Sequence, residues 1–260
     1  MRGMKNVLFA PKEGWARRIQ ETVDPAKFRV AFQEFGDPDV ALDDFDCVVP
    51  LRLQDYRPLR TRPINGRANF LIPGEPVVAL TDDKSRMNEF LLTNGFEEFV
   101  PEIYGEQVAY PFIYKKRRDE WGAYSRIIRS PEEKRDLEKI ITQDDYFKQE
   151  YVCGNIEYVT HILAMEGRLR YVLTYEHTFD SEYFIKGKWA NYRSWRKIDT
   201  PFIEVFVSIL ENLNFTGTCC FNFKLANGVP KIFEMNSRYG ATLTLEVNAY
   251  LDAYLDALAA

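Results

Sequence analysis

The segment Glu234-Met235-Asn236, near the end of the chain, has the residue types and spacing of a site for a hard cation. We expect it to form a strand, and in a strand residues two apart point to the same face. Glu234 and Asn236 would then present two oxygen ligands side by side. Mg²⁺ takes ligands of this kind and leaves its other positions to water and phosphate. The pair alone is equally compatible with the polar edge of a hairpin that binds nothing.

Asn222 is the candidate third ligand, and its position depends on an expected turn at Asn227-Gly228. If the loop has two residues, Asn222 lies opposite Phe233. If the loop has three residues and a glycine bulge, Asn222 lies opposite Glu234. Only the second geometry gathers three oxygen donors in one place.

Residues 149–157 carry a pattern that could hold a nucleoside. Glu150-Tyr151-Val152 is followed by Cys153-Gly154 and by Glu157, and we expect a strand that kinks at the glycine. Exposed backbone at such a kink can hydrogen-bond to the edge of an adenine, and a nearby carboxylate can accept from ribose hydroxyls. Solvated acids on an ordinary strand are the simpler alternative.

Two lysines could supply positive charge to the same site. Lys84 opens an expected helix, and Lys115 ends the apolar run that starts at Pro111. Two cations that converge from separate elements could hold a triphosphate. Taken singly, each lysine is more simply explained as a solvated side chain.

The elements that must position these residues begin with a small N-terminal unit. Apolar runs at 5–9, 46–50 and 77–80 predict strands, and residues 15–23 have helical spacing. Strands separated by helical stretches indicate a mostly parallel α/β unit. The segment 57–76 is rich in proline and glycine, which predicts a loop.

The rest of the chain predicts antiparallel hairpins with a few helices. A helix capped by Asp82 or Thr81 is expected over 83–94, with further helices over 199–212 and the last 15 or so residues. Strands are expected at 111–115, 124–128 and 147–152, and hairpins at 155–175 and 218–235, whereas 179–197 reads as irregular. The predicted fold class is an α/β N-terminal subdomain followed by a two-lobed α+β fold with antiparallel sheets.

In their order along the chain, these motifs resemble the ATP-grasp superfamily of carboxylate–amine ligases. The resemblance covers about residues 82–245. It implies a pre-ATP-grasp subdomain at 1–80, a central lid-bearing lobe at 81–142 and a C-terminal lobe with the metal site at 143–260. ATP would lie between the last two lobes.

The resemblance also implies a role for each candidate residue. The phosphates of ATP would be contacted by Lys84 and Lys115, the adenine would pair with a hinge at Glu150, Tyr151 and Val152 and be sandwiched by Ile113 and Phe233, and the ribose would be held by Glu157. Mg²⁺ would be held by Asn222, Glu234 and Asn236. The acyl phosphate would be faced by Arg238, acting with Lys115.

The sequence departs from the family pattern at two places. The loop over 116–122 has a single glycine where the family has several, so Arg117 or Arg118 could take over part of the phosphate contact. Asn222 stands where an acidic ligand is common, and an amide attracts Mg²⁺ less strongly than a carboxylate does.

The expected chemistry is the ATP-driven joining of a carboxylate to an amine, or sometimes to a thiol. An ATP-grasp small-molecule kinase and a degenerate ATP-binding regulatory protein are left open. The sequence does not name the substrate. Surface cations that could recognise it are Lys12, Arg52, Arg193 and Arg196, and the two histidines His161 and His177 could act as bases, although structural roles are simpler for all of them.

The composition of the chain disfavours two classes of binding partner, nucleic acids and membranes. The net charge of −5 disfavours a nucleic-acid binder. The apolar run Val7–Ala10 is too short for a signal-peptide core, and no stretch approaches the roughly 18 apolar residues of a membrane span. We expect a cytoplasmic protein that acts on small-molecule carboxylates and amines, with reduced cysteines and no membrane partner; a homodimer is left open.

Overall fold

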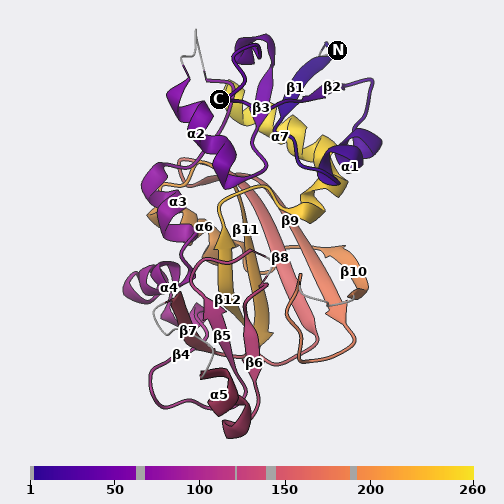
Figure 1. The fold of residues 1–260 in the computed structure, drawn as a ribbon. Coiled ribbons are helices and arrows are strands. Elements are labelled where there is room, and N and C mark those ends of the chain that lie inside the picture. Colours follow the sequence, from indigo (N-terminus) through magenta and orange to yellow (C-terminus); the bar gives the residue numbers. More distant parts are fainter. Residues whose placement is uncertain (1–2, 63–67, 121, 139–144, 188–191) are drawn as a thin grey trace.

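The computed structural model describes residues 3–62, 68–120, 122–138, 145–187 and 192–260, and these residues form three β-sheets (Figure 1). A three-stranded parallel sheet lies at the top of Figure 1, and antiparallel sheets of five and four strands lie below it. The predicted fold class, an α/β subdomain followed by a two-lobed α+β fold with antiparallel sheets, is confirmed.

The N-terminal sheet has the order β2-β1-β3 and consists of β1 (Lys5–Phe9), β2 (Phe28–Phe32) and β3 (Cys47–Val49). The apolar ends of β1 and β3 are fully buried because parallel strands are covered on both faces. Helix α1 (Trp15–Thr22) directs Trp15 and Ile19 into the same core. Strand β2 was not predicted from the sequence.

Two predictions in the connection to the rest of the chain are wrong. Residues 77–80 are not a strand but part of helix α3 (Glu75–Thr81), and the expected loop over 57–76 overlaps helix α2 (Tyr56–Thr61). Proline in the first turn of α3 is typical of a helix start, whereas a four-residue apolar run does not distinguish a strand from a helix. Short 3₁₀ turns lie at Leu42–Asp44 (η1), Leu53–Asp55 (η2) and Glu97–Phe99 (η3).

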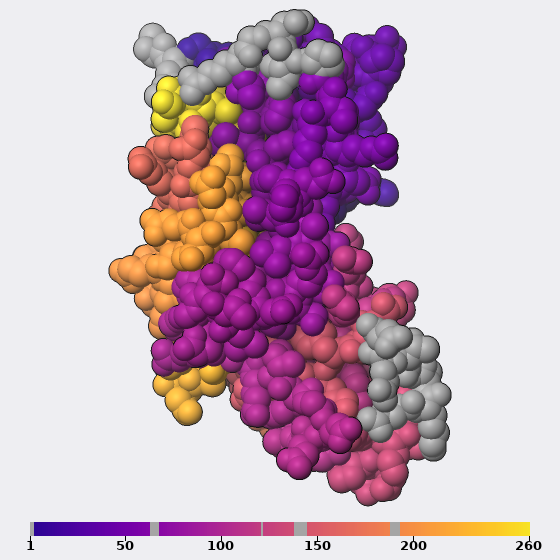
Figure 2. Space-filling model, turned by 90° about the vertical axis from the view of Figure 1, so that its left-hand side faces the viewer, coloured from indigo at the N-terminus to yellow at the C-terminus, as the bar shows by residue number. Residues whose placement is uncertain are grey.

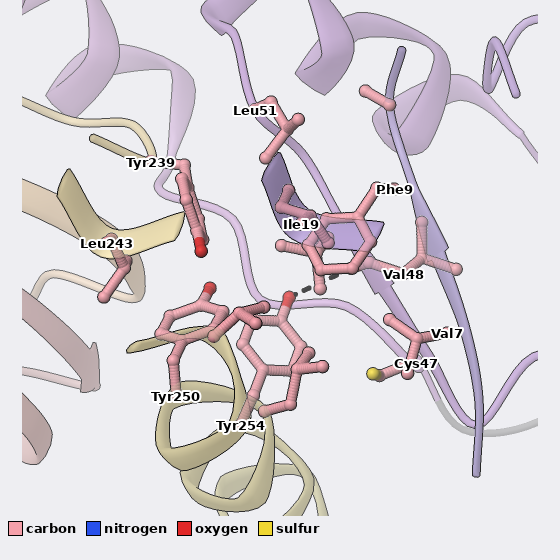
Figure 3. Close-up of a cluster of buried hydrophobic side chains, with 14 of the residues drawn as sticks. Val7, Phe9, Ile19, Cys47, Val48, Leu51, Tyr239, Leu243, Tyr250 and Tyr254 are labelled. Carbon is pink, nitrogen blue, oxygen red and sulfur yellow. Dashed lines mark hydrogen bonds between the residues drawn. The ribbon is translucent and has the colours of Figure 1, made fainter. Parts of the chain in front are cut away.

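The C-terminal helix α7 (Val247–Ala259) packs against the N-terminal sheet. Its tyrosines point toward the strands in Figure 3, and Tyr254 Oη donates to the carbonyl of Val48 at 3.1 Å and accepts from the amide of Leu71 at 2.6 Å. Tyr250 is also fully buried there. The two ends of the chain therefore share one core, although the expected division assigned the last residues to the C-terminal lobe.

The middle sheet has the order β4-β7-β5-β6, with β4 (Ile103–Tyr104), β5 (Phe112–Lys116), β6 (Arg126–Ile128) and β7 (Tyr146–Glu150). Helix α4 (Lys84–Thr93) precedes its strands in the sequence, and helix α5 (Pro131–Glu138) lies between β6 and β7. Strand β7 pairs with both β4 and β5, so the middle sheet extends beyond the boundary expected at residue 142. Figure 2 shows the purple segment that contains α3 and α4 on the face turned toward the viewer, between the N-terminal part above and the magenta segment below.

The large sheet has the order β10-β9-β8-β11-β12, with β8 (Ile156–Met165), β9 (Arg168–Phe179), β10 (Tyr192–Ile198), β11 (Gly217–Ala226) and β12 (Val229–Asn236). Helix α6 (Ile203–Asn212) buries Phe206 against β11, and η5 (Ala241–Glu246) leads into α7. The expectation of irregular structure over 179–197 is wrong at its end, where β10 pairs with β9. Among the described residues, no helix is both long and apolar enough to cross a membrane.

Candidate functional site

A cavity of about 210 Å³ lies between the middle sheet and the large sheet. Its lining includes every residue to which a nucleotide, metal or catalytic role was assigned from the sequence: Lys84, Ile113, Lys115, Glu150, Tyr151, Val152, Glu157, Asn222, Phe233, Glu234, Asn236 and Arg238. The fold thus brings together residues that are separated by up to 154 positions along the chain (Lys84 to Arg238).

The β11–β12 hairpin positions the three candidate metal ligands in a way that neither turn model predicted. The loop has two residues, Asn227 and Gly228, both with positive φ (54° and 80°). That loop would oppose Asn222 to Phe233, but the register shifts between Asn222 and Phe223, so Asn222 lies opposite Glu234. Asn222 Nδ2 donates to Glu234 Oε2 at 3.2 Å.

The register shift also frees a backbone acceptor for Lys115. The Nζ atom of Lys115 donates to the carbonyl of Phe233 at 2.6 Å and to Gln149 Oε1 at 3.1 Å, which links the middle sheet to the large sheet. The pKa of Lys115 is lowered to about 7, chiefly by burial; Glu234 opposes the shift and Lys84 adds to it. Lys115 is therefore a buried cation whose charge depends on the anions that reach it.

Lys84 reaches the site from the first residue of α4. Its Nζ atom lies 3.2 Å from Glu234 Oε1 and donates to the carbonyl of Asp119 at 2.7 Å. The helix is capped by Asp83, whose side chain accepts from the amides of Ser85 and Arg86, rather than by Asp82 or Thr81 as expected. Burial alone would raise the pKa of Glu234, but Lys84, Lys115 and Arg238 hold it below its usual value, so Glu234 is ionised.

The donor set suits a hard cation that brings anionic ligands of its own. Glu234 supplies one carboxylate, and Asn222 and Asn236 supply neutral amides. No cluster of three or more His, Cys, Asp or Glu side chains with metal-binding geometry occurs within the described part of the chain. Both oxygens of Glu234 already have a hydrogen-bonding neighbour, so a metal ion would compete with Lys84 for this carboxylate.

The residues predicted to form a hinge, Glu150, Tyr151 and Val152, lie at the end of β7 and directly after it. Glu150 is tied to the backbone of Glu102, because its amide donates to the carbonyl at 2.8 Å and its Oε2 accepts from the amide at 3.1 Å. The expected kink is present at Gly154, where φ is 117°. Glu157 is buried and lies 3.3 Å from Lys186 Nζ; burial raises its pKa, against the effect of Lys186.

Lys224 is a cavity residue that was not predicted from the sequence. Its buried Nζ atom donates to the carbonyls of Val152 and Gly154 at 3.0 and 2.9 Å and lies 3.3 Å from Tyr151 Oη. It also lies 4.1 Å from the centre of the Phe184 ring. The signal that could have found it is its spacing: it is two residues after Asn222, on the same face of β11.

The loop over 116–122 covers one side of the cavity. Arg117 pairs with Asp83 at 2.8 Å, and Arg118 lies 3.6 Å from Asp82, so both arginines have acidic neighbours within the protein. Gly122 lines the cavity with φ at 63°. A Cβ atom at this position would come within 2.5 Å of Ile185 Cγ2, so the loop packs directly on the segment that carries Phe184 and Lys186. Residue 121 of this loop lies outside the described residues.

A second cavity of about 310 Å³ adjoins the first. Lys84, Glu234, Asn236 and Arg238 line both. The residues that complete the second cavity come from η2, from the end of α3, from the segment after β5 and from the end of β12: Leu53, Thr81, Asp82, Arg118, Asp119, Glu120, Tyr124 and Ser237. Three of the candidate metal and phosphate residues, Lys84, Glu234 and Asn236, therefore lie where the two cavities meet.

The remaining candidates separate into two groups. His161 lines the first cavity, and its Nε2 lies 2.7 Å from Thr242 Oγ1, whereas His177, Arg193 and Arg196 line neither cavity. Burial lowers the pKa of each histidine to about 3, so both are neutral near pH 7. Arg196 pairs with Glu176 on the far edge of the large sheet. The four cysteines are free thiols.

Solved structures with the same fold include ligases and synthases. D-alanine–D-alanine ligase from Bacillus anthracis is 15% identical, with 98% of this chain and 95% of that chain covered and a TM-score of 0.59. Phosphoribosylamine–glycine ligase from Thermotoga maritima is 16% identical, with 96% and 75% covered and a TM-score of 0.65. N5-carboxyaminoimidazole synthase from Aspergillus clavatus, solved with ADP, is 11% identical, with 98% and 78% covered and a TM-score of 0.64.

These similarities concern the fold, because the identities are low. No family model and no curated protein matches the sequence. At the level of the fold the predicted resemblance is nevertheless confirmed, since these ligase and synthase structures match 96–98% of this chain with TM-scores of 0.59 to 0.65.

Proposed function

We propose that this chain, which has the ATP-grasp fold, is an ATP-dependent ligase that activates a small-molecule carboxylate and joins it to an amine. The observation that carries the proposal is a cavity lined by the proposed hinge, by two buried lysines and by the cluster of Glu234 with two asparagines. A second cavity adjoins it at Glu234, Asn236 and Arg238. Some solved structures of the same fold hold ATP or ADP.

The nucleotide would lie with its base at the hinge and its phosphates toward β12. Tyr151, Val152, Ile113 and Phe233 offer apolar surface and backbone groups for the base, and Glu157 offers a carboxylate for the ribose. Lys84 and Lys115 would bind the phosphates, and anions beside Lys115 would keep it protonated. The lysines thereby orient the nucleotide and neutralise its charge.

Glu234, Asn222 and Asn236 would hold Mg²⁺ through oxygen atoms. When bound, the ion would neutralise phosphate charge as the γ-phosphoryl group moves. Lys84 would then leave Oε1 of Glu234 and turn to the phosphates, which lie on the side of the cavity that it already lines.

The proposed reaction has two steps. A carboxylate oxygen of the substrate, held at Arg238, attacks the γ-phosphorus, and the bond to the β–γ bridging oxygen breaks, which releases ADP. The amine nitrogen then attacks the acyl carbon, inorganic phosphate leaves, and the nitrogen loses a proton to solvent. Arg238 can stabilise the acyl phosphate because it lines both pockets where they meet.

The experiment that tests the proposal is ADP release with pooled carboxylates and amines, with the products identified by mass spectrometry. A ligase yields free phosphate and a product that contains both the acid and the amine. A phosphorylated acceptor without free phosphate would identify a kinase, and nucleotide binding without turnover over a broad panel would identify a regulatory protein. Either outcome contradicts the ligase proposal.

A further inference from the structure

Arg238, which lines the cavity, and Lys12, which lies over the ring of the cavity residue Trp15, form no ion pair among the described residues. Arg238 forms no ion pair with any described residue, and its one hydrogen bond is to the carbonyl of Tyr239 at 3.4 Å. Lys12 likewise forms no ion pair within the described chain. Its Nζ atom lies 3.5 Å from the centre of the Trp15 ring, and Trp15 lines the cavity together with Arg238.

Arg52, in the same N-terminal unit as Lys12, is a cation with carboxylates in direct contact. Arg52 lies 2.9 Å from Asp55 and 3.3 Å from Glu34, so two carboxylates compensate its charge. Lys12 is half-buried and has no carboxylate of the described residues in direct contact. Its pKa is lowered to about 8, chiefly by burial and also by the positive charges of Arg238 and Arg52, against the opposing effects of Glu120 and Asp55. An anion placed between Lys12 and Arg238 would relieve both effects.

A third group with an unpaired polar atom lines the same cavity as Arg238. His161 is 1% exposed, lines the cavity, and its Nδ1 atom has no hydrogen-bond partner among the described residues. Buried polar atoms in folded proteins are normally paired, so an unpaired one in a cavity wall indicates a place for a polar ligand. Trp15, whose ring lies under the Nζ atom of Lys12, lines the same cavity and offers it a flat apolar surface.

We infer that the substrate carries two anionic groups: Arg238 faces the carboxylate that is activated, and Lys12, from the N-terminal unit, binds the second anion against Trp15. This inference rests on the proposed function for the assignment of Arg238. The second anion is a carboxylate or a phosphate, because the chemistry of Lys12 accepts either. A substrate held at both ends would span the boundary between the N-terminal unit and the large sheet.

The test compares acids that differ only in their second anion. Calorimetry in the presence of ADP and Mg²⁺ would measure the binding of succinate, glutarate and 3-phosphoglycerate against their monoanionic counterparts succinamate, glutaramate and glycerate. We expect at least one dianion to bind about tenfold tighter than its counterpart, the size of one charge-assisted contact. The phosphate and carboxylate arms identify which anion Lys12 accepts.

Variants assign the preference to Lys12. Lys12→Met should abolish it and Lys12→Arg should retain it, with circular dichroism confirming the fold of both. Lys27→Met is the matched control, because Lys27 belongs to the same unit and pairs with Asp252 at 3.1 Å on its surface. A wild-type protein with no dianion preference in any pair, or a preference that survives in Lys12→Met, overturns the inference.

The outcomes separate this inference from the proposed function. Dianion binding that depends on Lys12, with no ADP release from any acid and amine, would retain the anion site and refute the ligase. ADP release from monoanionic acids with no dianion preference would retain the ligase and refute the second-anion site.

Discussion

Lys84 Nζ lies 3.2 Å from one carboxylate oxygen of Glu234, and Asn222 Nδ2 lies 3.2 Å from the other. Glu234 is thus held between a cation and an amide at the junction of the two cavities. Because Asn222 and Asn236 are neutral, Glu234 carries the only formal negative charge among the three candidate metal ligands. The consequences of this arrangement can be measured.

Glu234→Gln should reduce turnover by at least about 100-fold, the range typical for loss of one electrostatic contact in a transition state. The side chain keeps its size and can still accept from Lys84, so the hairpin should stay folded by circular dichroism. Glu211→Gln is the control, because Glu211 is an exposed acid on α6. Near-normal ADP release by Glu234→Gln at saturating magnesium would refute the metal site.

Nucleotide affinity should fall with pH because of Lys115. Burial lowers the pKa of this lysine to about 7, so the free protein loses the ammonium as pH rises above 7. Phosphates bind the protonated form, and the affinity is therefore highest below pH 7 and falls above it by up to about tenfold per pH unit. Calorimetric titration with ADP between pH 7.5 and 9 would measure this slope.

Lys115→Arg provides the control for that measurement, since an arginine stays charged over this range. Its ADP affinity should be flat with pH even if it is weaker in absolute terms. A slope in Lys115→Arg equal to that of the wild type would show that another group titrates.

Lys224→Met should weaken nucleotide binding through the hinge. The change leaves the carbonyls of Val152 and Gly154 without their buried donor, and each such loss costs about 1–3 kcal/mol. We expect a lower melting temperature and a raised KM for ATP. Lys231→Met is the matched control, because Lys231 lies opposite Lys224 in the register of the hairpin. Its Nζ atom, unlike that of Lys224, donates to an exposed carbonyl, that of Glu98. Equal effects of the two variants would contradict a hinge role.

Gly122→Ala should disturb the packing of the 116–122 loop on Ile185 at the cavity wall. The backbone there has a positive φ, and a new Cβ would lie 2.5 Å from Ile185 Cγ2. Gly95→Ala separates the two effects, because Gly95 has a positive φ and no atom within 4 Å of a new Cβ. Both variants should lose stability, but only Gly122→Ala should raise the KM for ATP, and adding Ile185→Ala should restore it. A KM for Gly122→Ala that matches the wild type would exclude this contact from nucleotide binding.

The sequence by itself determined the features that depend on neighbouring residues. Alternation placed Glu234 and Asn236 on one face, Asn227-Gly228 predicted a hairpin turn, and the glycine after Cys153 predicted the kink. Such features follow from backbone geometry over a few residues, so they can be derived without knowledge of the fold. The gathering of the candidate residues into one site was predicted only through the resemblance.

The tertiary structure alone decided the rest, because the deciding contacts join distant segments. A register shift beside Phe233 sets Asn222 opposite Glu234. At the same place the carbonyl of Phe233 accepts a hydrogen bond from Lys115, which is 118 residues away in the sequence. Lys224 is held by its hydrogen bond to the carbonyl of Val152. Tyr254 of α7 is held by its hydrogen bond to the carbonyl of Val48 in β3, 206 residues earlier. A local pattern carries no record of such partners, and buried polar groups take whichever partner the packed chain brings within reach.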